Sequence, residues 1–163
     1  MQKTHLNKID LNILRELQKD ARITYSELAR RVGLSTSPCM ERVKRLERKG
    51  IIKGYNTQLN PSKLNAGLVV FVQIRLTRSS QDIFREFKRV ITQLPEIQEC
   101  FLVSGNFDYL IKARVGDMEQ YHKFLVETLL TLPGVHESTS YVSMEQVKET
   151  AIISLERAIT AND

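Results

Sequence analysis

The sequence predicts an α+β fold with two units: an N-terminal winged helix-turn-helix domain of three helices and a C-terminal βαββαβ sandwich of ferredoxin-like topology. Apolar residues recur at helical spacing three times before residue 50. Beyond residue 66, runs rich in β-branched residues alternate with helical patterns. Charge also divides the chain. Residues 1–60 hold 13 Lys/Arg and 6 Asp/Glu (+7), and residues 61–163 hold 11 and 13 (−2), which together give the net +5.

Two short helices are expected first. An apolar stripe predicts a helix over residues 7–19, and Asn7 and Asp10 are placed to cap its start. A capping-box sequence then precedes a second helix over Tyr25–Val32. Gly33 suits the left-handed residue that ends such a helix.

The third helix should begin within the run Ser35 to Pro38 and end at Gly50. Its buried face consists of Cys39, Val43 and Leu46. A tight turn joins it to the second helix, which is the helix-turn-helix arrangement. Residues 51–59 are expected to form a strand, which would complete a domain over residues 1–59.

A linker is predicted over residues 60–66, where Asn, Pro and Ser break the pattern. The remaining pattern predicts strands over residues 68–76, 97–103, 107–115 and 135–144, and helices over residues 83–94 and 118–129. Residues 94–100 resemble residues 132–138 at an offset of 38. Residues 67–148 are therefore expected to form two copies of a strand–helix–strand unit, and residues 149–163 a C-terminal extension.

One face of the predicted sheet lacks a cover. Two helices would cover the other face, while the strands carry apolar side chains on both sides. An apolar face exposed to water favours association, and a second copy of the chain is the simplest partner.

The third helix carries candidate DNA contacts. Its outward face is rich in cations, which contact phosphates or guanine edges, and hydroxyl groups lie at its start. The candidate residues are Ser35, Thr36, Ser37, Pro38, Glu41, Arg42, Lys44, Arg45 and Arg48. Weaker candidates, for contact with the DNA phosphate backbone, are Arg30, Arg31 and Lys53. The alternative is a solvated helix in which Glu41 and Arg45 form an i,i+4 pair.

The turn over residues 104–109 is a candidate ligand site. Asp108 is an acid among apolar neighbours and could hold an ammonium group, while Gly105 would let a ligand approach the backbone. Taken from spacing alone, a purely local role remains open, in which Asp108 accepts hydrogen bonds from nearby N–H groups.

Signatures of other classes are missing from the sequence. It has no glycine-rich phosphate loop, no H-E-x-x-H, no paired CxxC and no G-x-S-x-G, so we expect neither an enzyme nor a metal site. Two cysteines, no secretory signal and no long apolar run favour a reducing cytosol and no membrane span. The alternatives are an amino-acid sensor attached to an enzyme, RNA recognition on the bare sheet, and a structural nucleoid protein.

Several segments together resemble one known family. They are Ile9 to Leu17, Ile23 to Ser35, Pro38 to Glu47, Leu102 to Tyr109, Leu132 to Val135 and Met144-Glu145. They resemble the bacterial Lrp/AsnC transcription regulators over about residues 6–150, nearest to the leucine-responsive branch.

The resemblance implies a regulatory domain of the RAM type and dimers that assemble into tetramers, octamers or higher species. It also implies an amino acid bound between dimers and no other cofactor. Carried over by position, the effector residues would be Leu102, Ser104, Gly105, Asp108, Met118, Tyr141, Val142 and Ser143.

The expected function is sequence-specific regulation of amino-acid metabolism by a cytoplasmic, nucleoid-associated protein that binds double-stranded DNA. The candidate effector residues combine one carboxylate with apolar side chains and hydroxyl groups, which favours leucine or alanine over lysine or glutamate. The alternative is a nucleoid-associated DNA-bending protein with little or no effector response.

Overall fold

The computed structural model describes residues 6–77 and 81–156. The chain folds as two units. The helical unit contains the N-terminal residues through Gln58 and, in addition, the chain from Lys148 onward. The sheet unit contains Leu59–Val147. The chain therefore crosses between the units twice, once in each direction.

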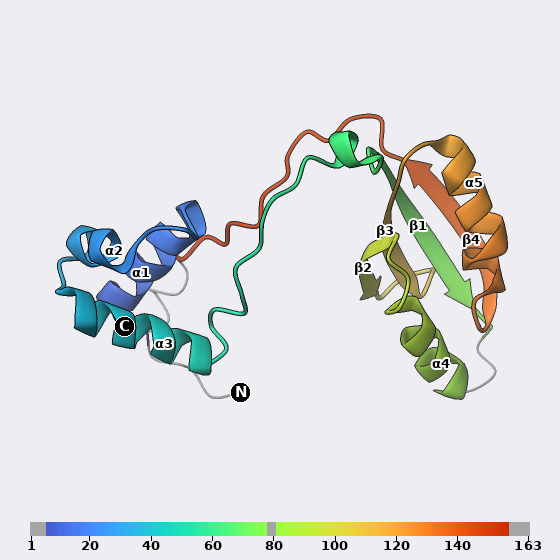
Figure 1. The fold of residues 1–163 in the computed structure, drawn as a ribbon. Coiled ribbons are helices and arrows are strands. Elements are labelled where there is room, and N and C mark those ends of the chain that lie inside the picture. Colours follow the sequence, from blue (N-terminus) through green and yellow to red (C-terminus); the bar gives the residue numbers. More distant parts are fainter. Residues whose placement is uncertain (1–5, 78–80, 157–163) are drawn as a thin grey trace. The chain divides into compact units, whose positions relative to one another are not determined.

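The helical unit is built from α1 (Lys8–Lys19), α2 (Tyr25–Val32) and α3 (Thr36–Arg48) (Figure 1). Asn7 caps α1 in a reciprocal capping box with Asp10, as the sequence predicted. The apolar stripes of the three helices meet in one core, which contains Ile13, Leu14, Leu28, Ala29, Cys39, Val43 and Leu46. Because Cys39, Val43 and Leu46 point into this core, the opposite side of α3 faces solvent.

Two glycines set the ends of α2 and α3. Gly33 takes a left-handed conformation at φ 71° directly after α2, and this permits the sharp turn into α3. Gly50 takes φ 67° after α3, and the amide of Ile51 then donates to the carbonyl of Leu46. Both helix ends agree with the prediction from sequence.

The strand predicted over residues 51–59 is wrong. These residues belong to no described strand, and the chain from Lys53 to Leu59 has no regular secondary structure. A β-branched pair at Ile51 and Ile52 gives strand propensity, but a strand also needs a neighbour for its backbone groups. No described segment supplies that neighbour.

The return segment, residues 148–156, packs on the helical unit. The side chain of Gln18, near the end of α1, donates from Nε2 to the carbonyl of Ile153 at 3.2 Å. The amide of Ile153 donates back to Gln18 Oε1 at 2.7 Å. Leu155 packs against the helical core. The described part of the expected C-terminal extension is therefore part of the helical unit.

The sheet unit has one antiparallel sheet with strand order β2-β3-β1-β4. The strands are β1 (Leu68–Leu76), β2 (Ile97–Leu102), β3 (Tyr109–Val115) and β4 (Val135–Val142). The helices α4 (Gln81–Ile91) and α5 (Met118–Glu127) follow β1 and β3 (Figure 1). Short 3₁₀ helices occupy Pro61–Leu64 and Leu129–Thr131. This is the predicted βαββαβ topology, with each repeat copy supplying one central and one edge strand.

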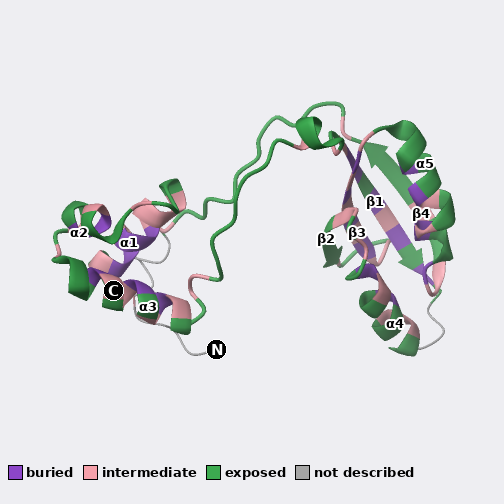
Figure 2. Cartoon of the chain, viewed as in Figure 1, coloured by how far each residue is buried: buried purple, intermediate pink, exposed green. Residues whose placement is uncertain are grey.

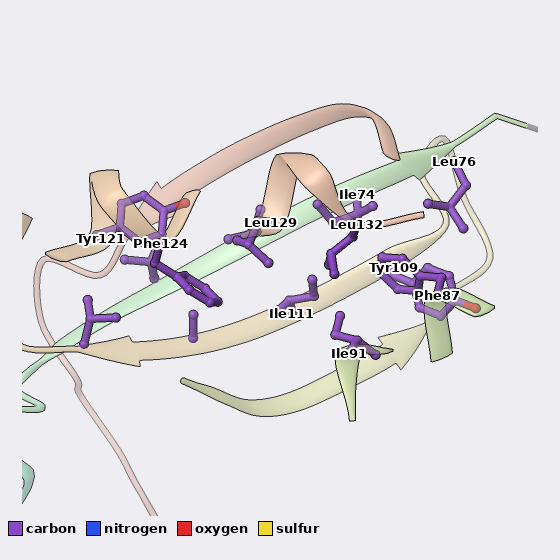
Figure 3. Close-up of a cluster of buried hydrophobic side chains, with 14 residues drawn as sticks. Ile74, Leu76, Phe87, Ile91, Tyr109, Ile111, Tyr121, Phe124, Leu129 and Leu132 are labelled. Atoms are coloured by element: carbon purple, nitrogen blue, oxygen red, sulfur yellow. The ribbon is translucent and has the colours of Figure 1, made fainter. Parts of the chain in front are cut away.

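One face of this sheet and both helices enclose the core (Figure 3). Alternate residues of β1 and β3 point into it, including Ile74 and Ile111, and they meet Phe87 and Ile91 from α4. Tyr121 and Phe124 come from α5. The two helices thus cover the same face, because all of these side chains belong to one buried cluster.

The opposite face of the sheet unit is only partly apolar. Phe71 of β1 pairs with Tyr141 of β4, and both remain exposed. Figure 2 shows exposed positions interrupting the buried ones along β1. Polar pairs share this face, among them Lys112 Nζ with Glu99 Oε1 at 3.0 Å. The prediction of an uncovered face is confirmed, and the charged pairs were not foreseen.

Within the described residues, no helix is long and apolar enough to cross a bilayer. Nor do three or more His, Cys, Asp or Glu side chains gather there in a way that could hold a metal ion. Cys39 is a buried free thiol and Cys100 an exposed one.

Candidate DNA-binding surface and effector site

The start of α3 presents small polar groups to solvent. Ser35 is the N-cap residue of α3, and its side chain makes no capping hydrogen bond. Ser35, Thr36, Ser37 and Pro38 are all exposed. Hydroxyl groups and unpaired N–H groups at a helix N-terminus are suited to phosphate oxygens. The predicted residues therefore lie together at one accessible helix end.

The outer face of α3 contains Glu41, Lys44 and Arg48, all exposed. Lys44 and Arg48 form no ion pair with any described residue. They lie four residues apart and so share one side of the helix. Lys53, a weaker candidate, is also exposed, in the segment after α3. This surface can meet a polyanion without first giving up a partner.

Arg42 and Arg45 differ from the other cations of α3, because both donate to the buried carboxylate of Asp10. Arg42 Nη1 lies 3.0 Å from Asp10 Oδ1, and Arg45 Nη2 lies 2.8 Å from each of its oxygens. Arg45 still reaches the surface, since its side chain is 41% exposed, but it is paired with a carboxylate, which the sequence did not predict. The alternative pair with Glu41 is not formed. The sequence predicted only a capping role for Asp10. Its arginine partners lie 32 and 35 residues further along the chain, too far for a local pattern to reveal.

Arg30 and Arg31 are also engaged. Both donate to Glu27, and Arg31 Nη1 reaches Glu16 at 2.9 Å. Hydrogen bonds from Arg30 and then Arg31 lower the pKa of Glu27 to about 2. Lys19 and then Arg31 lower the pKa of Glu16 from its usual value. To contact the DNA backbone as predicted, Arg30 and Arg31 would therefore have to exchange their carboxylate partners for phosphates.

In the turn between β2 and β3, Asp108 has a structural partner. One of its carboxylate oxygens accepts from the amide of Leu76 at 2.8 Å, and its own amide donates to Ile74 at 2.9 Å. Arg75 Nε donates to the carbonyl of Asn106 at 2.9 Å. These bonds tie the turn to the end of β1. Asp108 therefore has a structural role, but its partner amide lies 32 residues away and not within the turn, as the local alternative had expected.

The eight predicted effector residues fall into two groups at opposite ends of the sheet. Leu102, Ser104, Gly105 and Asp108 lie at the end where Leu102 pairs with Tyr109. Met118, Tyr141, Val142 and Ser143 lie at the other end, where Val142 pairs with Val70 and β3 finishes before α5. The seven residues of β3 separate the groups by about 20 Å. One chain does not bring them together.

Comparison with known families agrees with this architecture. Residues 6–53 match the winged helix-turn-helix DNA-binding model. Residues 69–153, more than half of the chain, match the Lrp/AsnC ligand binding domain. The chain belongs to the Lrp/AsnC family of transcriptional regulators. It therefore carries a helix-turn-helix DNA-binding domain and an amino-acid-binding domain.

Individual relatives support this assignment. The leucine-responsive regulatory protein of Escherichia coli K12 is 58% identical over 145 residues, which are 89% of this chain and 88% of that protein. A transcriptional regulator from Neisseria meningitidis, solved as a complex with L-Met, gives a TM-score of 0.90 at 36% identity, covering 94% of this chain and 99% of that one. An AsnC family regulator from Agrobacterium tumefaciens gives 0.89 at 34% identity, covering 93% and 99%.

Proposed function

We propose that this regulator reads duplex DNA with the exposed side of α3. The observation that carries the proposal is the surface that combines Lys44 and Arg48 with the hydroxyl-rich start of α3, directly after the Gly33 turn. Cations unpaired with carboxylates release counterions from DNA at no cost in broken ion pairs. Glu41 on the same face can accept from a cytosine amino group.

The proposed effector is a small or aliphatic amino acid, leucine or alanine, bound between copies of the chain. Apart from Asp108, the candidate residues carry no charge that would pair with a charged ligand side chain. A carboxylate can hold the ligand ammonium group, and hydroxyl groups can donate to the ligand carboxylate. The relative that responds to leucine and the neighbour solved with L-Met both support an uncharged ligand side chain.

Assembly is part of the same proposal. The two effector groups lie at opposite ends of one sheet, so a complete pocket needs a second chain. Dimers that associate further would supply it, in tetramers, octamers or higher species. Such a protein would act by binding in the cytoplasm, at the nucleoid, and would catalyse no reaction.

The test measures DNA binding and ligand binding on the same sample. Duplexes selected from a random pool would be titrated by fluorescence anisotropy, with and without leucine, alanine or lysine. We expect a preferred sequence and an affinity that leucine or alanine changes and lysine does not. Sequence preference without any amino-acid response would favour the DNA-bending alternative, and equal affinity for all duplexes would contradict DNA reading.

A further inference from the structure

The carboxylate of Asp10 is the buried acid of the helical unit. Asp10 is 1% exposed and is the one buried polar or charged residue among those the structure describes. It accepts from the amide of Asn7 at 3.3 Å, which closes the capping box of α1. It also accepts from the two arginines of α3. A capping role alone requires none of the arginine contacts.

Arg42 and Arg45 each bind Asp10 through only one of their nitrogen atoms. Arg45 reaches Asp10 with Nη2 alone, and its side chain remains 41% exposed. Arg42 uses Nη1, which lies 3.0 Å from Asp10 and 3.5 Å from Asn7 Oδ1, and it remains 27% exposed. An arginine has five N–H donors in a rigid fork. Anchoring one nitrogen therefore restricts the orientation of the group and leaves other donors open to solvent.

We propose that Asp10 is a positioning residue for DNA recognition: it holds Arg45, and with it Arg42, in one orientation on α3. This inference rests on the proposed DNA contact of α3. A free arginine side chain loses rotamer freedom when it binds, whereas an anchored one has lost that freedom already. Anchoring should therefore increase the difference in affinity between the preferred sequence and other sequences, because base contacts depend on geometry. It should change the general attraction to phosphates much less.

The variant that tests the proposal is Asp10→Asn. An amide oxygen can still accept from the Asn7 amide, so the helix cap is retained while the charge that orients the arginines is lost. Asp20→Asn is the matched control, since it makes the same chemical change in the same helical unit. Asp20 is exposed, and its side chain accepts from the amide of Arg22.

The measurement is the ratio of affinity for the selected duplex to affinity for a scrambled duplex, at several salt concentrations. We expect Asp10→Asn to lower this ratio about tenfold, the size of one lost base contact. The salt dependence on scrambled DNA should stay the same or steepen, because two cations are released from a carboxylate. Asp20→Asn should match the wild type in both respects.

A double-mutant cycle with Arg45→Lys separates positioning from mere stability. Lysine keeps the charge but has no planar fork. If Asp10 acts through Arg45, each single variant lowers the ratio and the double variant lowers it little further. An unchanged ratio in a folded Asp10→Asn protein overturns the proposal, whatever happens to its melting temperature. If Asp10→Asn does not fold, an unchanged ratio in Arg45→Lys overturns it, and a lowered one supports it.

These outcomes are distinct from failure of the proposed function. A wild-type protein that prefers no sequence would refute DNA reading itself. A wild-type protein that discriminates, together with an Asp10→Asn variant that discriminates equally well, would refute the positioning role alone.

Discussion

Arg48 and Arg45 lie three residues apart on α3 but differ in what they are free to do. Arg45 is anchored to Asp10, whereas Arg48 has no ion pair with any described residue. We expect Arg48→Ala to weaken binding to all duplexes alike and to reduce the slope of log affinity against log salt by about 0.9, one phosphate contact. Lys88→Ala on α4 is the control, because Lys88 is an exposed lysine outside the helical unit. An unchanged slope in Arg48→Ala would show that Arg48 does not contact a DNA phosphate.

Glu27 gives a prediction about pH. Because Arg30 and Arg31 hold its pKa at about 2 in the folded protein, against an ordinary value of 4.5, its pairs are complete above pH 4.5. Their contribution should fade as pH falls toward 2, when the folded carboxylate takes up its proton. The pairs are exposed, so we expect a small effect that salt screens. Melting temperatures of the wild type and Glu27→Gln should differ near neutral pH and converge at acid pH. A constant difference would contradict the pairing.

The return segment behaves as a further element of the helical unit. Leu155 packs on the helical core, and Ile153 exchanges two hydrogen bonds with Gln18. We expect Leu155→Ala to lower the free energy of unfolding of this unit by about 1–2 kcal/mol, less than for a fully buried leucine. Ile152→Ala is the control, since Ile152 is 59% exposed, and it should change little. Hydrogen exchange of α1 amides would report the difference. Equal protection in both variants would show that the docking is unimportant.

Elements with local signals were predictable. The bounds of α2 and β1 agree with the sequence prediction, because the Thr24 N-cap, a glycine stop and a β-branched run each act over a few residues. The reciprocal half of the predicted capping box is not formed, since Glu27 bonds Arg30 and Arg31. The repeat also predicted the sheet topology, since each copy builds the same unit. The predicted helix over residues 83–94 instead starts at Gln81 and ends at Ile91, as α4. An apolar stripe shows which face of a helix is buried, but it does not fix where the helix begins or ends.

Features that depend on distant partners were not predictable. The strand predicted over residues 51–59 does not form, because no neighbouring strand pairs with it, and sequence periodicity does not report whether a neighbour exists. Asp10 and Arg45 are 35 residues apart, and Gln18 and Ile153 are 135 apart. From sequence, Arg45 looked as available as Arg48, because helical geometry alone places both on or near the outer face. The DNA-binding role of this α3 surface stays a prediction, and which of its cations are paired with a carboxylate could be learned only from coordinates.

The uncovered sheet face leads to a prediction for the assembled molecule. Phe71, Phe101 and Tyr141 are exposed on or near this face. Burying apolar area at about 25 cal/mol per Å² favours packing against a second copy. We expect sedimentation at micromolar concentration to show at least a dimer and no stable 18.8 kDa species. Phe71→Asp should weaken the dimer, because it places a charge in the interface. Val126→Asp, on an exposed position of α5, should not.

The proposed effector site gives the last prediction. Its two groups of candidate residues lie at opposite ends of the sheet, so one pocket that contains both groups would need two chains. Asp108→Asn should abolish the response to leucine or alanine while its amide oxygen still accepts from Leu76. Met118→Lys, at the other end, should also abolish it by placing a cation beside the ligand. If the pocket joins one end of one chain to the other end of another, mixed assemblies of these two inactive variants contain some intact pockets.

The measurement is the amino-acid response of DNA binding after the two variants are unfolded together and refolded as a mixture. Partial recovery is expected in the mixture and in neither variant alone. The control is a mixture of Asp108→Asn with Ser104→Ala, both altered at the same end of the sheet. No chain in this mixture offers an unaltered copy of that end, so no recovery is expected. Recovery in the control, or its absence in the first mixture, would contradict a pocket shared between chains. The response would then have to arise within one chain, where the two groups of residues lie about 20 Å apart along β3.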